Sequence, residues 1–187
     1  DGTLTHSHTF WRFLLQCAGT GRFVGSILRS LNLLPKLWRG QVDLMQAREV
    51  LIDRCLSGVS EQKAHAVAVR LTDQIANQLL RDGALDAVRR HQQQGHETFI
   101  VSNSAEYYLT LLAQRLQMNG VFGSRFEVVD GCLTGKLQGT HCQGAEKVAR
   151  VQAVLEDRTN ARVYAYGDSS GDIALLNWAD YPFLRRF

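Results

Sequence analysis

The chain has 187 residues, 45% hydrophobic and 21% charged, which is enough to bury one large core or a core with an inserted module. Its net charge is +3 and no stretch is dense in Lys or Arg, so nucleic acid is not expected as a partner. No apolar run is long enough for a bilayer span. The cysteines lack metal-type spacing, which favours free thiols in a reducing, cytoplasmic compartment; they are Cys17, Cys55, Cys132 and Cys142.

Residues 10–80 are expected to be helical almost throughout, because apolar residues recur there at helical spacing. Glycine-containing pairs punctuate the pattern, and Ser60 is an acceptable N-cap for the last helix. Nothing in this region predicts a strand. The expected helices are Phe10–Leu15, Phe23–Leu37, Val42–Leu56 and Ala64–Leu80.

Helical and strand patterns alternate after Gly83, which predicts an α/β fold with a parallel sheet. Thr98–Val101 and Arg162–Tyr166 are the candidate buried strands. Tyr181–Phe187 fits either a last strand or an anchoring tail. The expected helices are Ala84–Gln94, Ala105–Leu116, Glu146–Leu155 and Asp172–Ala179.

A hairpin is predicted between the second and third of these helices. Phe126–Val129 and Cys132–Leu137 are strand-like runs separated by the pair Asp130-Gly131. An Asp-Gly pair between two such runs is typical of a two-residue type I′ turn.

Three separated segments and one lysine carry candidate chemistry. Asp1-Gly2-Thr3-Leu4-Thr5 opens the chain, Ile100–Ser104 is a strand ending in hydroxyls, and Tyr166–Asp172 is a strand ending in a glycine and two carboxylates. Lys147 follows Gly144 on a predicted helix. In an open parallel sheet, ligands bind outside the carboxyl ends of the strands, where Ser102 and Asp168 are expected.

These residue types predict metal-assisted chemistry on a phosphate. Asp168 and Asp172 flank a glycine-containing turn, so both carboxylates can face one point, which suits a hydrated Mg²⁺ ion. Lys147 adds a positive charge for the phosphate, and the Ser102 hydroxyl is a short donor to its oxygens.

The ordered motifs resemble those of the haloacid dehalogenase superfamily. Asp1-Gly2-Thr3 matches the second half of its DxDGT motif, and Gly167–Asp172 matches its fourth motif. Leu133–Lys136 and Gly144-x-x-Lys147 resemble the phosphoserine-phosphatase-like branch. The resemblance implies a Rossmann-like parallel-sheet core, residues 1–9 and 82–187, with an inserted all-helical cap, residues 10–81.

The resemblance also implies a role for each residue in a Mg²⁺-dependent phosphomonoesterase with an aspartyl-phosphate intermediate. Asp1 would be the general acid and base and would contact the metal, which Asp168 and Asp172 also hold. Ser102 and Lys147 would hold the phosphoryl group and complete the catalytic set. Gly2, Thr3 and Asn103 would join them in binding phosphate.

The nucleophilic aspartate of this family belongs two residues before Asp1, on an apolar strand in the middle of the sheet. A parallel sheet without its central strand exposes unpaired backbone on both sides of the gap. We therefore expect the sequence to be incomplete, and the chain as written to have no turnover. The alternatives are a phosphotransferase and a catalytically silent module that binds phosphate or Mg²⁺.

The substrate is expected to be a small-molecule or lipid-linked phosphate. Phosphoserine phosphatases place an acidic residue where this chain has His8, which argues against phosphoserine. The segment Arg22–Arg39 sets Arg22, Arg29 and Lys36 at heptad spacing among apolar residues, a pattern suited to peripheral membrane contact. The insert is similar to that of phosphatidylglycerophosphatase-like members of the branch.

Three further expectations concern structural roles. Ser104 is the better helix cap, which leaves Ser102 for the site. His6 and His8 are expected to be structural or solvent-facing. The tryptophans are expected to pack in the interior, namely Trp11, Trp38 and Trp178.

Overall fold

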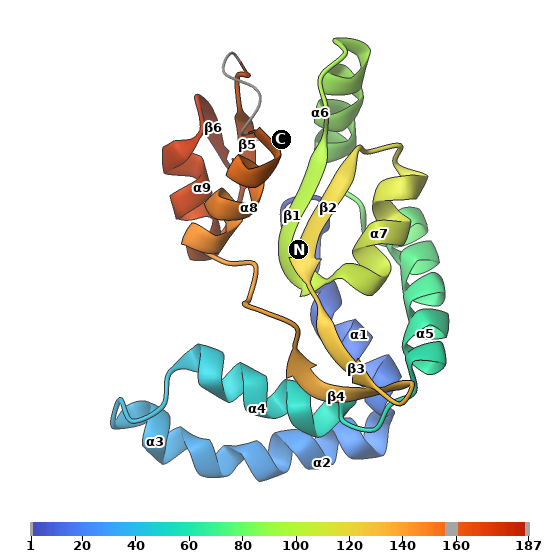
Figure 1. Cartoon of the computed structure of the whole chain (residues 1–187), viewed down its shortest axis with the longest axis vertical. Helices are drawn as coiled ribbons and strands as arrows, with labels where there is room; N and C mark the ends of the chain where they lie inside the picture. Colours follow the sequence, from blue (N-terminus) through green and yellow to red (C-terminus); the bar gives the residue numbers. More distant parts are fainter. Residues whose placement is uncertain (1, 156–160, 186–187) are drawn as a thin grey trace.

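The structure, a computed structural model, describes residues 2–155 and 161–185. Its N-terminal part is helical and forms the lower half of the molecule in Figure 1. Asp43 starts α4 with a capping box, since its side chain accepts from Gln46 N while Gln46 accepts from Asp43 N. Ser60 caps α5, as predicted. The elements are α1 (Thr9–Ala18), α2 (Thr20–Ser30), the 3₁₀ helix η1 (Leu31–Leu33), α3 (Leu34–Trp38), α4 (Leu44–Leu56), α5 (Glu61–Gln74) and the π-helix η2 (Ile75–Leu79).

The remaining elements alternate between helix and strand, which confirms the predicted α/β class. Apart from a hairpin, they divide into two groups that stand side by side in Figure 1. One group is α6 (Asp82–Gln93), β1 (Phe99–Ala105), α7 (Glu106–Arg115) and β2 (Gly120–Ser124). The other is α8 (Ala145–Leu155), β5 (Tyr164–Gly167), η3 (Ser170–Asp172), α9 (Ile173–Trp178) and β6 (Tyr181–Leu184).

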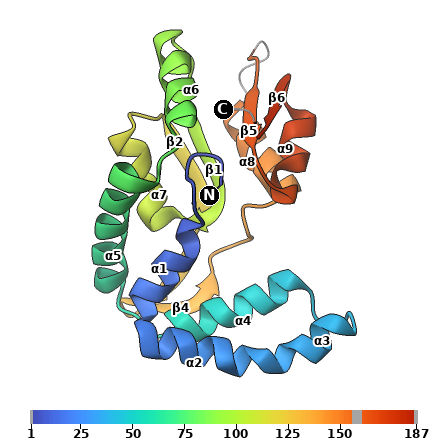
Figure 2. The same cartoon turned by 180° about the vertical axis from the view of Figure 1, so that it is seen from behind.

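Each group contains two parallel strands. β1 pairs with β2, and β5 pairs with β6, but β1 and β5 do not pair with each other within the described residues. The view from behind shows the same separation of the two strand pairs (Figure 2). The parallel sheet is therefore present as two halves.

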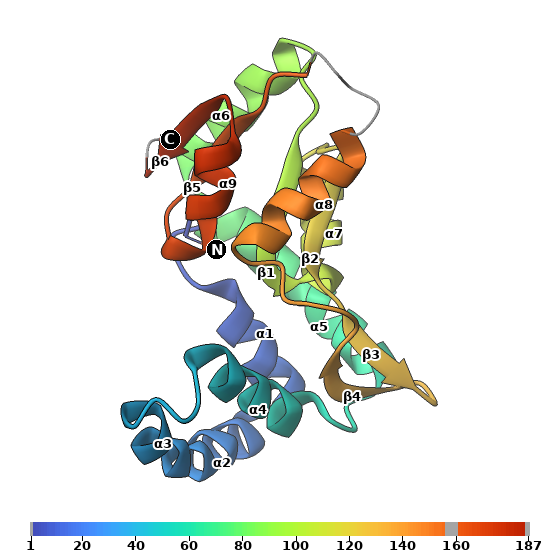
Figure 3. The same cartoon turned by 60° about the vertical axis from the view of Figure 1, so that its left-hand side comes forward.

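A hairpin of β3 (Phe126–Val129) and β4 (Cys132–Leu137) follows β2, with its tip pointing outward in Figure 3, and β4 contacts α4. Asp130 and Gly131 both have positive φ, and Val129 pairs with Cys132, so the predicted two-residue type I′ turn is confirmed. Backbone bonds from Gly58 N to Leu133 O and from Leu133 N to Val59 O fasten the hairpin to the loop between α4 and α5.

Two separate hydrophobic clusters reflect this division. The larger one joins α1, α4 and α5 to α7 and β1, with Phe13, Leu71 and Tyr108 fully buried. The smaller one is formed by Ala165, Leu175 and Leu176, with residues of α8 and Val101 of β1 packed against it. The helical half and the β1–β2 group thus share one core, and the β5–β6 group has its own.

The two chain crossings between the predicted core and cap lie next to each other. Thr5 bridges Leu80, His6 N donates to Leu79 O, and Arg81 N donates to Leu4 O. These contacts are consistent with a boundary near residues 9 and 81, and the division into core and cap stays a prediction.

Some local expectations were wrong. The predicted helix Phe23–Leu37 is interrupted by the 3₁₀ turn Leu31–Leu33, which precedes Pro35. Ser104 is not a helix cap: it lies in β1, and its side chain hydrogen bonds with Tyr108. Trp11 is 41% exposed and Trp38 is 91% exposed, so neither packs in the interior; among the described elements, none covers Trp38 at the end of α3.

Other outcomes depend on pairing and burial. The strand Gly120–Ser124 was missed because its sequence contains two glycines and little alternation; its register with β1 defines it. Tyr181–Leu184 is a strand paired with β5. All four cysteines are free thiols, as predicted, and burial raises the pKa of Cys17 to about 12.

The β5–β6 group also contacts α6 through a pair of histidines. His91 Nδ1 lies 2.9 Å from His96 Nδ1, and His91 Nε2 lies 3.0 Å from the Tyr166 hydroxyl. One Nδ1 must donate and the other must accept, so the contact requires at least one neutral ring. Burial lowers the pKa of His91, and the nearby His96 and Arg90 lower it further.

The free energy of unfolding is therefore expected to decrease as the pH falls below about 6.5, the ordinary histidine value. The sign follows from the lowered pKa of His91, because the folded state disfavours the charged ring that acid produces in the unfolded chain. Urea unfolding between neutral and mildly acidic pH measures this slope. His91→Gln should flatten it, whereas His65→Gln, at an exposed position, should preserve it. An unchanged slope in His91→Gln would contradict the prediction.

Candidate active site

A cavity of about 970 Å³ lies between the two halves of the sheet. β1 lines one side of it, and the opposite side is formed by β5 and the turn that follows. Helices α6 and α8 supply further lining residues, and His8, Phe10, Trp11 and Arg48 line it from the N-terminal half. The cavity follows the strand edges of β1 and β5 that are unpaired within the described part of the chain.

Lys147 connects the two halves at one end of this cavity. It lies on α8, only 6% of its surface is exposed, and its Nζ donates to Asp172 Oδ1 at 2.6 Å and to Val101 O at 3.0 Å. Burial raises the pKa of Asp172, but the Lys147 ammonium and the hydrogen bonds from Ser169 outweigh it, so this pKa lies below its ordinary value. Asp172 is therefore a carboxylate at neutral pH.

The second oxygen of Asp172 organises the turn after β5. Asp172 Oδ2 accepts from Asp168 N, Ser169 N and the Ser169 hydroxyl at 3.2, 3.0 and 2.7 Å. Asp172 thus holds the backbone of Asp168 in place. Asp168 itself sits directly after the carboxyl end of β5, as the sequence predicted.

The N-terminal segment meets Asp168 from the other side. Thr3 Oγ1 donates to Asp168 Oδ1 at 2.8 Å. Gly2 packs so closely that an added Cβ would lie 2.1 Å from Asp168 Oδ2, and its φ of +83° is one that other residues rarely adopt. Arg81 Nε donates to Gly2 O at 3.0 Å and fastens this turn. Asp1 lies outside the described residues.

Ser102 and Asn103 line the cavity from inside β1, where its register with β2 shifts, so β1 continues past the strand end that was predicted at Ser102. The Ser102 hydroxyl accepts from Ser104 N at 3.3 Å. The Asn103 side chain donates to Gln143 Oε1 and lies 3.0 Å from both Ser124 Oγ and His141 Nδ1. Asn103 is therefore held in a fixed orientation by three neighbours.

Arg48 is a site residue that sequence reasoning missed. It reaches from α4 to donate to Asn103 O at 2.8 Å, and its guanidinium lies 4.3 Å from the centre of the Phe10 ring. Its Nε is buried without a hydrogen-bond partner among the described residues. The sequence offered no signal for this position, since Arg48 sits inside a regular helical pattern.

The residues at this end of the cavity can accommodate a hydrated divalent cation. Mg²⁺ keeps several waters and needs only one or two protein carboxylates, and Asp168 offers hard oxygen donors at a strand end. No group of three or more His, Cys, Asp or Glu gathers as a metal-binding cluster in the part of the chain that is described. A fully protein-ligated site, such as structural zinc, therefore does not fit the described donors.

Comparison with known proteins defines the class of this chain. A family model described as haloacid dehalogenase-like hydrolase matches residues 1–177. The chain therefore belongs to this family of hydrolases, and the family resemblance found in its motifs is confirmed.

Among curated proteins, the chain is similar to Protein CicA of Caulobacter vibrioides, with 30% identity over 191 residues that cover 100% of this chain and 83% of the relative. It is also similar to the phosphoserine phosphatase of Haemophilus influenzae, with 25% identity over 168 residues. That match covers 89% of this chain but only 49% of the enzyme.

Solved structures confirm the fold. A protein of unknown function from Bordetella pertussis Tohama I has a TM-score of 0.80 at 24% identity, covering 98% of this chain and 86% of that one. A substrate-bound phosphoserine phosphatase complex has a TM-score of 0.67 at 18% identity, covering 96% and 79%. The predicted Rossmann-like α/β core with additional helices agrees with these neighbours.

Proposed function

We propose that the protein is a Mg²⁺-dependent phosphomonoester hydrolase that acts through an aspartyl-phosphate. The observation that supports this most directly is the convergence of separated motifs at one end of one cavity. Thr3 contacts Asp168, and Lys147 contacts both Asp172 and the backbone of β1. The named activities of the phosphoserine phosphatase relatives support the reaction class.

The proposed reaction has two displacements. A carboxylate on a strand between β1 and β5, two residues before Asp1, attacks phosphorus while the ester P–O bond breaks, and Asp1 protonates the leaving oxygen. Asp1 then takes a proton from water, whose oxygen attacks phosphorus and releases inorganic phosphate and the free carboxylate. Both steps conserve charge and atoms without a further reactant.

The described residues would bind and orient the phosphoryl group. The Ser102 hydroxyl and the Lys147 ammonium would neutralise and position its oxygens, with Gly2, Thr3 and Asn103 nearby. Bound Mg²⁺ would screen charge and orient the phosphate for in-line attack, held by Asp168 and by Asp1. We propose that Asp172 supports this ion through the Asp168 loop, because its own oxygens are engaged by Lys147 and Ser169.

The cap side of the cavity suggests the kind of leaving group. His8 and Arg48 line it there, and neither carries the negative charge that would form an ion pair with a substrate ammonium. A leaving group with a second anionic or polar group, such as a glycerol-linked phosphate, would fit Arg48 better than an amino acid. We therefore propose small-molecule or lipid-linked phosphates other than phosphoserine.

The test uses a form of the protein in which an apolar strand ending in Asp-Xaa is joined directly ahead of Asp1. Phosphate release from an aryl phosphate is measured in the presence of Mg²⁺ and in the presence of a chelator. We expect phosphate release only with Mg²⁺. We also expect glycerol-linked phosphates to be better substrates than phosphoserine. Transfer of phosphate to added alcohols in place of water would indicate the phosphotransferase. No phosphate release from a folded protein that binds Mg²⁺ would indicate the catalytically silent binding module.

Gly2→Ala is expected to weaken Mg²⁺ binding at least about tenfold, because the new Cβ would displace the Asp168 carboxylate. Calorimetric titration with Mg²⁺ measures this directly, without turnover. Gly21→Ala is the matched control, since an added Cβ meets nothing within 4 Å there and should leave affinity unchanged. Equal Mg²⁺ affinity in both variants would exclude Asp168 as a ligand.

A further inference from the structure

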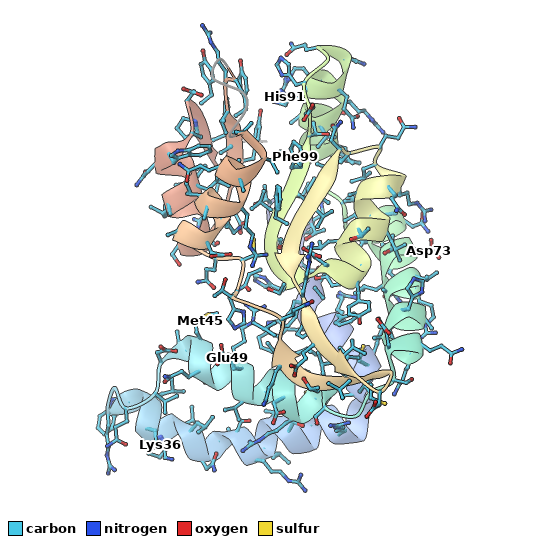
Figure 4. The ribbon with its side chains drawn as sticks, in the orientation of Figure 1. Lys36, Met45, Glu49, Asp73, His91 and Phe99 are labelled. Carbon is cyan, nitrogen blue, oxygen red and sulfur yellow. The ribbon has the colours of Figure 1, made fainter. Side chains whose placement is uncertain are left out.

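A helical arm, made of α2, η1 and α3 (residues 20–38), extends along the bottom of the molecule away from the cavity (Figure 1). Lys36 is near its outer end (Figure 4). One side of the arm packs against α4, where Ser26 is buried and Arg22 donates to the backbone oxygens of Arg54 and Ser57. The arm is therefore a folded, anchored element with one face left uncovered.

The uncovered face carries a stripe of large apolar side chains. Leu28 is 60% exposed, Leu34 56% and Trp38 91%, and Leu31 lies between them at 50%. Val24 and Ile27 extend the stripe at the same three- and four-residue spacing. Single exposed apolar residues are ordinary, but a contiguous row of six marks an interaction surface.

The same arm is strongly basic. Between Thr20 and Arg39, which covers the arm and the residue after it, the sequence has four Arg or Lys residues and no Asp or Glu. Arg22 is engaged by backbone oxygens, but no described carboxylate forms an ion pair with Arg29, Lys36 or Arg39. The chain as a whole is only +3, so positive charge is concentrated beside the apolar stripe.

We propose that this arm lies on the surface of an anionic lipid membrane. The apolar stripe would enter the interface while Arg29, Lys36 and Arg39 meet lipid phosphates, the pattern of an interfacial amphipathic helix. Trp38 suits the headgroup level, where tryptophan is enriched. A second copy of the chain is a poorer occupant, because two uncompensated basic arms would repel each other.

The attachment is peripheral in this proposal. No described helix is both long and apolar enough to cross a membrane. The arm packs on α4, the helix that also places Arg48 in the cavity, so a docked arm would hold the cavity near the lipid surface. Membrane docking does not depend on the phosphatase proposal.

The test is sedimentation of the full chain with phosphatidylglycerol–phosphatidylcholine vesicles and with pure phosphatidylcholine vesicles. We expect binding to the anionic vesicles that weakens with salt, and little binding to the neutral ones. A blue shift of the Trp38 emission, obtained by subtracting the Trp38→Phe spectrum, should accompany binding. Because vesicle binding needs no turnover, its failure is distinct from failure of the phosphatase.

Two sets of substitutions separate the two contributions. Arg29→Gln, Lys36→Gln and Arg39→Gln together should weaken binding to anionic vesicles about a hundredfold. Leu28→Gln with Trp38→Gln should weaken it at least about tenfold. Val129→Gln, at another exposed apolar position on β3, is the matched control and should bind like the parent. All these side chains are exposed, so circular dichroism should show the same fold.

Three outcomes would overturn the proposal. The first is no vesicle binding by the folded parent chain, and the second is equal binding to neutral and anionic vesicles. The third is a dimer in analytical ultracentrifugation that Leu28→Gln with Trp38→Gln dissociates, which would assign the stripe to a second copy of the chain.

Discussion

Joining an apolar strand that ends in Asp-Xaa directly ahead of Asp1 is expected to produce Mg²⁺-dependent phosphate release, whereas the same strand ending in Asn-Xaa is not. The expected difference in rate is at least about 10⁴-fold, because loss of a catalytic nucleophile typically costs this much or more. The expectation that the added strand folds into place depends on the geometry of the cavity.

The cavity has the dimensions and chemistry of a strand site. Its volume is about 970 Å³, and β1 and β5 face it from opposite sides. An extended segment of six residues spans about 20 Å, the usual length of a strand. Backbone groups along both strand edges need hydrogen-bond partners once water is excluded, and a parallel strand between them would supply those partners.

Phosphate release from an aryl phosphate should be compared between the chain and its strand-extended form. An extended variant with Asn in place of the added Asp is the essential control, since it restores the sheet without the nucleophile. It should match the extended protein in stability and show no phosphate release. Turnover by the Asn variant, or by the chain alone, would disprove the assigned nucleophile.

Lys147→Met is expected to lower the free energy of unfolding by about 3–5 kcal/mol. The Lys147–Asp172 pair is almost fully buried, with 8% and 11% of the side-chain surfaces exposed. Methionine keeps the apolar stem but removes the ammonium, so the Asp172 carboxylate would remain buried without its cation. The contact from Lys147 Nζ to Val101 O, which joins α8 to β1, is lost as well.

Urea unfolding without Mg²⁺ measures this loss. Lys136→Met, at an exposed position on β4, is the matched control and should change stability by less than about 0.5 kcal/mol. Adding Asp172→Asn to Lys147→Met should recover part of the loss, because the uncompensated charge is then absent. Equal stability of the two lysine variants would mean that water reaches Asp172 and screens it.

The sequence by itself determined most of the element types, although it did not predict β2 or the 3₁₀ turn at Leu31–Leu33. Periodicity separated a helical region from an alternating one, and Asp130-Gly131 specified the hairpin turn through its left-handed backbone. Asp168 could be placed at a strand end because polar residues follow a short buried run there, whereas β1 continues past Ser102 to Ala105. These are local properties, expressed over a few neighbouring residues.

The tertiary structure alone decided the individual contacts, although the motif resemblance had already brought Thr3, Lys147, Asp168 and Asp172 to one site. No sequence pattern predicts that Lys147 bonds Asp172, that Thr3 bonds Asp168, or that Arg48 reaches Asn103 from another helix. The exposure of Trp38 also depends on tertiary structure, because none of the described elements packs over it. Such contacts join residues far apart in the chain, and only the packing of the elements brings them together.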